Sequence, residues 1–79
     1  MRCLATFHTH LSALRTHKRL AARQIEASLA PVPRKLSSSC GTCIRYRADD
    51  ASLEEMDLDV EAVYEHLGDD TYRLLLRNE

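Results

Sequence analysis

Residues 52–68 read SLEEMDLDVEAVYEHLG, and the secondary structure of this stretch decides the fold. Ser52 and Glu55 form the S-x-x-E capping box that begins many helices. The apolar residues that follow recur at helical spacing up to Gly68, a typical helix end: Leu53, Met56, Val60, Val63, Tyr64 and Leu67. The pattern therefore predicts a second helix. One alternative stays open, because residues 60–65 would also suit a strand paired with residues 71–77 through a Gly68-Asp69-Asp70 turn.

The rest of the chain supplies four strands and one further helix. Residues 2–8, 25–29 and 43–47 alternate in side-chain polarity, and residues 71–77 read as a last strand. Residues 10–24 carry an apolar stripe at helical spacing, and Thr9 is their expected N-cap. The order β-α-β-β-α-β predicts an α+β, ferredoxin-like sandwich, in which a four-stranded antiparallel sheet carries two helices on one face.

Length and charge limit the function classes. A chain of 79 residues predicts a single domain over residues 1–79, with little room for an enclosed substrate pocket. Residues 1–48 hold nine of the 11 Lys and Arg residues, whereas residues 49–79 hold 11 of the 12 acids. We expect the two halves to pack together and neutralise each other. We do not expect a nucleic-acid partner, because the basic residues are not interleaved with stacking aromatics.

The N-terminal residues and the three cysteines bear on location. The first residues lack a long apolar core, so no signal peptide is predicted, and no apolar run is long enough to cross a membrane. Three cysteines do not suit a disulfide-stapled secreted scaffold. We therefore expect a cytoplasmic protein, without a membrane partner, whose cysteines are thiols.

The loop Ser37-Ser38-Ser39-Cys40-Gly41-Thr42-Cys43 is the strongest chemical signal in the chain. Small hydroxyl residues and a glycine should leave the Cys40 thiol exposed. In the expected topology this loop lies at the N-terminus of the first helix, where free amides and the helix dipole favour an anion such as a thiolate. Side chains that could add positive charge there are His8, His10, Arg34 and Arg45.

The same loop carries a family resemblance. Pro33-Arg34-Lys35-Leu36-Ser37-Ser38-Ser39-Cys40-Gly41, Ile44-Arg45-Tyr46, Thr6-Phe7, Thr9-His10 and Ala13-Leu14-Arg15 resemble the small bacterial proteins called selenium/sulfur carrier-like. The resemblance covers about residues 4 to 47. It implies a domain that handles sulfur or selenium, with Cys40 as the carrier thiol. Cys43 departs from the family, which more commonly has a small residue there, and the acidic stretch from Asp49 to Asp59 fits the family's second-helix region poorly in length.

These features favour a carrier over a stand-alone enzyme. Cys40 would hold sulfur or selenium as a persulfide or selenosulfide and pass it from a donor protein to an acceptor protein. No cofactor and no bound metal are predicted for this role. The residues expected to bind the cargo or its charge are Ser38, Ser39, Gly41, Arg34, Arg45 and His10.

Three other functions stay open. Cys40 and Cys43 have C-x-x-C spacing, so Cys43 could act as a resolving thiol in a redox pair, although Cys43 should point to the opposite sheet face from Ile44 and Tyr46. The two cysteines with His8, His10 and His17 could in principle bind zinc. The chain could also be a non-catalytic interaction or ligand-sensing module, and two copies could then pair as a homodimer through the open sheet face.

Overall fold

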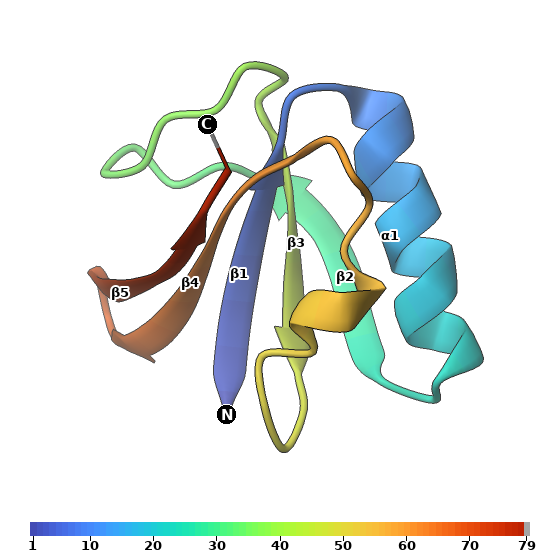
Figure 1. The fold of residues 1–79 in the computed structure, drawn as a ribbon. Coiled ribbons are helices and arrows are strands. Elements are labelled where there is room, and N and C mark those ends of the chain that lie inside the picture. Colours follow the sequence, from blue (N-terminus) through green and yellow to red (C-terminus); the bar gives the residue numbers. More distant parts are fainter. Residues whose placement is uncertain (79) are drawn as a thin grey trace.

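The computed structural model describes residues 1–78, which form one antiparallel β-sheet and one α-helix. The chain runs through β1 (Arg2–Phe7), α1 (His10–Ala22), β2 (Glu26–Pro31), β3 (Thr42–Arg47), the short 3-10 helix η1 (Leu53–Glu55), β4 (Val60–Gly68) and β5 (Thr71–Arg77). The sheet order is β2-β3-β1-β4-β5, and every neighbouring pair is antiparallel. Figure 1 shows α1 and η1 against the same face of the sheet. None of the described helices is long and apolar enough to cross a membrane.

The predicted four-stranded, two-helix sandwich is wrong, because residues 60–68 are a fifth strand. The capping box does not form: Ser52 has left-handed dihedrals, and its amide donates a hydrogen bond to Asp50 Oδ1 at 2.7 Å. Only one 3-10 turn follows. β4 then pairs with β1 and β5, which is the arrangement that the strand alternative described. Its valines and tyrosine suit a pleated surface better than a helix.

Polar side chains hold the segment before β4 against α1. Asp57 is buried, and its carboxylate accepts a hydrogen bond from Ser12 Oγ at 3.0 Å. Its amide donates to Thr16 Oγ1 at 2.9 Å. Ser12 and Thr16 are one helical turn apart, so both lie on the same face of α1. Asp57 and Asp59 therefore hold this segment against α1 through hydrogen bonds, instead of lying on the surface of a second helix.

Two apolar clusters lie on opposite faces of the sheet. The larger one, between the sheet and α1, contains among others Phe7, Leu20, Ile44 and Val63, all fully buried. The smaller one lies on the other face, where Val32 and Leu36 cover the residues Leu4, Cys43, Ala62 and Tyr64. Ile44 and Tyr46 thus face the main core, as the alternation predicted. We call the second face, which carries no helix, the open face.

We expect Thr9→Ala to lower the free energy of unfolding by about 1 kcal/mol. Thr9 is the N-cap of α1, and its Oγ1 accepts a hydrogen bond from the amide of Ser12 at 3.1 Å. The same hydroxyl donates to Asp59 Oδ2 at 3.3 Å. Urea unfolding curves measure the loss, and Thr9→Ser should retain most of the stability because it keeps the hydroxyl. Equal losses for both variants would contradict the capping role.

Candidate functional site

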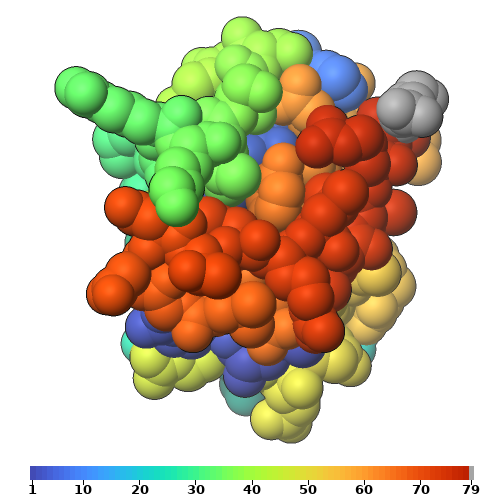
Figure 2. Space-filling view, turned by 90° about the vertical axis from the view of Figure 1, so that its left-hand side faces the viewer, coloured from blue at the N-terminus to red at the C-terminus, as the bar shows by residue number. Residues whose placement is uncertain are grey.

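The loop between β2 and β3 folds back on itself and covers part of the open face. Its two ends are joined where the amide of Val32 donates to the carbonyl of Gly41 at 3.1 Å. The amide of Leu36 donates to the carbonyl of Pro33 at 3.0 Å, which forms a turn. Gly41 has a φ of +75°, a left-handed conformation that side chains disfavour. Figure 2 shows this loop and the β4–β5 turn projecting to the same side of the molecule.

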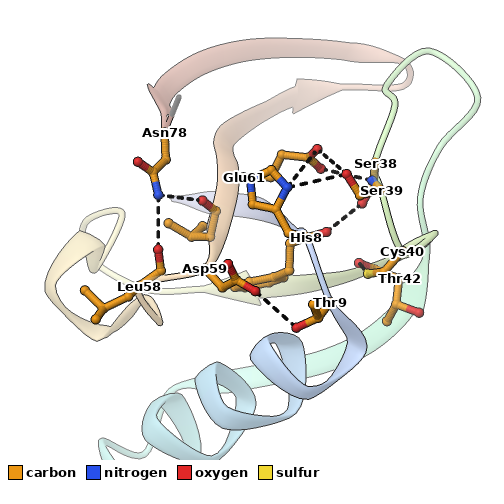
Figure 3. A network of polar contacts seen from close by, with 12 residues as sticks. His8, Thr9, Ser38, Ser39, Cys40, Thr42, Leu58, Asp59, Glu61 and Asn78 are labelled. Atoms are coloured by element: carbon orange, nitrogen blue, oxygen red, sulfur yellow. Dashed lines mark hydrogen bonds and ion pairs between the residues drawn. The ribbon is translucent and has the colours of Figure 1, made fainter.

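Cys40 lies at the end of this loop and is half-buried, whereas the sequence predicted an exposed thiol. Its side chain packs against the main apolar cluster, and the Sγ–H donates to the carbonyl of Thr42 at 3.5 Å. Figure 3 shows Cys40 near Thr9, the N-cap of α1. The small serines of the loop do not cover the thiol. It is half-buried because Cys40 packs against the core beneath the loop. The thiol therefore has one side against apolar packing and one side toward solvent.

A polar network anchors the residues just before Cys40 (Figure 3). Ser38 Oγ donates to the carbonyl of Phe7 at 3.1 Å. Ser39 donates twice to the Glu61 carboxylate, from its amide to Oε1 at 3.3 Å and from its hydroxyl to Oε2 at 3.0 Å. The loop is thus fixed to the end of β1 and to β4. Ser38 and Ser39 were predicted to bind the cargo, but in the structure their hydrogen bonds hold the loop in position.

The ionisable groups of this network are His8 and Glu61. His8 Nδ1 lies 3.4 Å from Ser39 Oγ and 3.6 Å from Glu61 Oε2. The network beside Cys40 therefore contains a carboxylate, which the sequence did not predict there. Sequence reasoning missed Glu61, because it placed that residue on a helix. The strand alternative could have found it, since β4 is the neighbour of β1 and Glu61 follows Val60, which is opposite Phe7.

The other predicted binding residues are spread over the molecule. His10 is the first residue of α1 and is exposed, while His8 contacts the loop. Arg34 is exposed on the loop. Arg45 does not join Cys40: it alternates with Ile44 and Tyr46 on β3, and it lines a hollow on the open face. The structure therefore brings Ser38, Ser39 and Gly41 to the cysteine but not Arg45.

Cys43 is fully buried and belongs to the apolar cluster on the open face, so the two loop cysteines contact opposite faces of the sheet. Its Sγ–H donates to the carbonyl of Pro31 at 3.5 Å. Burial raises the pKa of the Cys43 thiol, with Arg45 as a smaller lowering influence. Cys3 is also buried, and burial raises its pKa as well. All three cysteines are free thiols, and the two buried ones favour the protonated form.

The proposed zinc ligands do not converge. Among residues 1–78, no group of three or more His, Cys, Asp or Glu side chains is arranged to hold a metal ion. His17 lies on α1, and its Nε2 is 3.2 Å from the carbonyl of Ala27. The zinc hypothesis thus gains no support from the geometry.

We expect a thiol reagent such as iodoacetamide to modify Cys40 first. Cys40 is half-buried, whereas Cys3 and Cys43 are fully buried with raised pKa values, which lowers the thiolate fraction that reacts. Peptide mapping after short labelling at neutral pH should show one modified cysteine, and labelling in urea should show three. Labelling of Cys43 as fast as Cys40 in the folded protein would contradict this burial pattern.

Comparison with protein-family models matches most of the chain. The family model described as "Putative Se/S carrier protein-like" matches residues 2–65, which is most of the chain. The match includes β1, α1, the cysteine loop and the first part of β4. Searches of curated proteins and of solved structures find no match.

Proposed function

The chain belongs to the Se/S carrier protein-like family, and from this premise we propose that Cys40 is the thiol that carries the sulfur or selenium atom. The observation that carries the proposal is the difference among the three cysteines. Cys3 and Cys43 are buried on the two faces of the sheet, and Cys40 is the one with access to solvent. A donor or acceptor protein can therefore reach Cys40 without unfolding the core.

The surroundings of Cys40 support transfer between proteins. A Cβ atom added at Gly41, the residue after the cysteine, would meet no atom within 4 Å outside its chain neighbours, so there is open space at Gly41. The hydrogen bonds of Ser38 and Ser39 fix the preceding residues. The backbone at Cys40 is thereby held in a constant position, while its side chain can still turn toward a partner. Because the chain is small and the site shallow, the partner would supply the remaining catalytic groups.

The chemical step is a redox-neutral exchange. The Cys40 thiolate attacks the outer sulfur of a donor persulfide, R–S–SH; a new S–S bond forms on Cys40, the donor's S–S bond breaks, and R–S⁻ leaves. The proton lost by Cys40 is taken up by the leaving thiolate, so the net change is R–S–SH plus thiol giving R–SH plus Cys40 persulfide. Selenium transfers in the same way from R–S–SeH. Before attack, the thiol must turn away from the Thr42 carbonyl, since a carbonyl oxygen repels a thiolate.

Loading by a low-molecular-weight persulfide tests the proposal. The protein is incubated with glutathione persulfide without other thiols, desalted, and its intact mass is measured under non-reducing conditions. We expect a mass increase equal to one sulfur atom, which dithiothreitol removes and which peptide mapping assigns to Cys40. A protein that stays unmodified with both glutathione persulfide and its selenium analogue would contradict the carrier function.

A further inference from the structure

A basic hollow lies on the open face, at the end of the sheet where β1 begins and β3 ends. It measures about 450 Å³ and is lined by the side chains of Arg2, Arg45, Arg47, Glu26, Ser28 and His66. Three further lining residues, Cys3, Ala27 and Tyr46, belong to the apolar cluster on the other face, so they contribute backbone here. β1, β2, β3 and β4 all take part. The hollow is thus a feature of the sheet itself rather than of a loop.

The arginines of the hollow lie close to one another, which is electrostatically unfavourable. Arg2 and Arg47 are directly opposite each other in the β1–β3 pairing, and Arg45 is two residues along the same strand. Like charges in directly opposite positions destabilise a sheet. Among the described residues, no carboxylate lies within ion-pair distance of these arginines. The four ion pairs of the described residues all involve other basic residues. Glu26 is opposite Arg47, but the two do not form an ion pair.

His66 fixes the orientation of one of these arginines. Its Nε2 is 2.7 Å from the carbonyl of Asp69, which can only accept, so Nε2 carries the proton in the neutral ring. Nδ1 is then an acceptor, and it receives a hydrogen bond from Arg2 Nη2 at 3.3 Å. The ring also stacks on Tyr72, with centroids 4.7 Å apart. The Arg2 guanidinium is therefore held at the rim of the hollow with its other donors free for a ligand.

We propose that this hollow binds a phosphate-type oxyanion carried by a small molecule. Three guanidinium groups against one carboxylate give a net positive lining, and guanidinium forks bind tetrahedral oxyanions through paired hydrogen bonds. The Ser28 hydroxyl adds a donor on the β2 side. A hollow of about 450 Å³ exceeds the size of the anion alone, which leaves room for the group attached to it.

This site is separate from the cysteine loop. Cys40 lies before the start of β3 and packs on the face that carries α1, whereas the hollow lies toward the end of β3 on the open face. Arg45 and Arg47 are three and five residues beyond Thr42, or about 10 and 17 Å along a strand. Loss of anion binding would therefore leave the carrier proposal intact, and loss of cargo loading would leave this one intact.

Titration of the isotope-labelled protein with pyrophosphate tests the inference. Amide chemical shifts are followed by NMR at low ionic strength and again with added sodium chloride. We expect saturable shifts centred on residues 2, 26–28, 45–47 and 66, weakened by salt because the contacts are ionic. Shifts that remain linear with concentration, or that spread over all basic surfaces, would overturn the proposal. So would saturable binding of an acidic peptide at the hollow without any saturable binding of pyrophosphate.

Matched arginine variants locate the binding. Arg45→Gln should weaken pyrophosphate binding at least about tenfold, because it removes a charge-assisted hydrogen bond. Arg15→Gln is the control, since Arg15 is exposed on α1 and away from the hollow. Both variants should retain the dispersed spectrum of the folded protein. Equal affinity in the two variants would overturn the assignment, and the wild-type titration stands as an independent test if Arg45→Gln does not fold.

Discussion

Replacing Cys40 with serine is expected to abolish loading of sulfur and selenium. Serine is close to cysteine in shape and carries a hydrogen-bond donor, but it cannot form a persulfide, so the mass increase expected with glutathione persulfide should disappear. The loop should stay in place, because its anchors are the Ser38 and Ser39 hydrogen bonds and the Val32–Gly41 contact. We therefore expect at least a hundredfold loss of loading rate in a protein that stays folded, each tenfold corresponding to about 1.4 kcal/mol in the barrier.

Cys43→Ser is the matched control for this prediction. Cys43 is buried on the opposite face, and the direct exchange at Cys40 does not involve it. This variant should load at close to the wild-type rate, with some loss of stability because a hydroxyl enters an apolar cluster. If Cys43→Ser lost loading while remaining folded, a two-cysteine mechanism would replace the single-thiol carrier. The same result would give Cys43 the resolving role that its spacing suggested.

Replacing Phe7 with alanine is expected to remove most of the stability of the fold. Phe7 ends β1, is fully buried in the main cluster and is one of its largest side chains. Phenylalanine-to-alanine changes in cores cost about 3–5 kcal/mol. A chain of 79 residues has a total of roughly 4–12 kcal/mol at typical per-residue stability. A substantial unfolded fraction at room temperature is therefore expected, visible as loss of amide dispersion and a much lower urea midpoint.

Leu58→Ala provides the control for this stability loss. Leu58 is also a large apolar residue, but its side chain is 94% exposed in the segment before β4. Truncating it removes almost no buried surface, so the free energy of unfolding should change by less than about 0.5 kcal/mol. A small effect of Phe7→Ala, or similar effects of the two variants, would contradict the burial of Phe7 in the main cluster between the sheet and α1.

Local patterns were sufficient to predict α1 and four of the five strands. Thr9 caps α1 as expected, and the alternation along β1 and β3 correctly assigned Ile44 and Tyr46 to the core. The error came from residues 52–68, where helical spacing and strand alternation coexist. The Gly68-Asp69-Asp70 turn indicated the pairing of β4 with β5, but the pairing with β1, at the other end of the chain, is encoded in no local pattern.

The site could be predicted only in part, again because contacts between distant segments decide its structure. The sequence showed the cysteine loop as a run of small residues. It did not show how deeply Cys40 is buried, because the core that half-buries Cys40 comes from distant segments. Glu61 was missed along with the strand that carries it. Arg45 was assigned to the cysteine although alternation with Ile44 already placed it on the other face. The pattern along β3 was thus more informative for Arg45 than its position in the family motif.

The carrier function is tested most directly by the protein as its native host makes it. Purified under non-reducing conditions, the wild-type protein should contain a fraction whose intact mass exceeds the sequence mass by one sulfur or one selenium atom. That fraction should be sensitive to dithiothreitol and absent from Cys40→Ala expressed in the same host. A wild-type protein with no such fraction, or a Cys40→Ala protein that still carries it, would contradict the assignment of Cys40 as the carrier thiol.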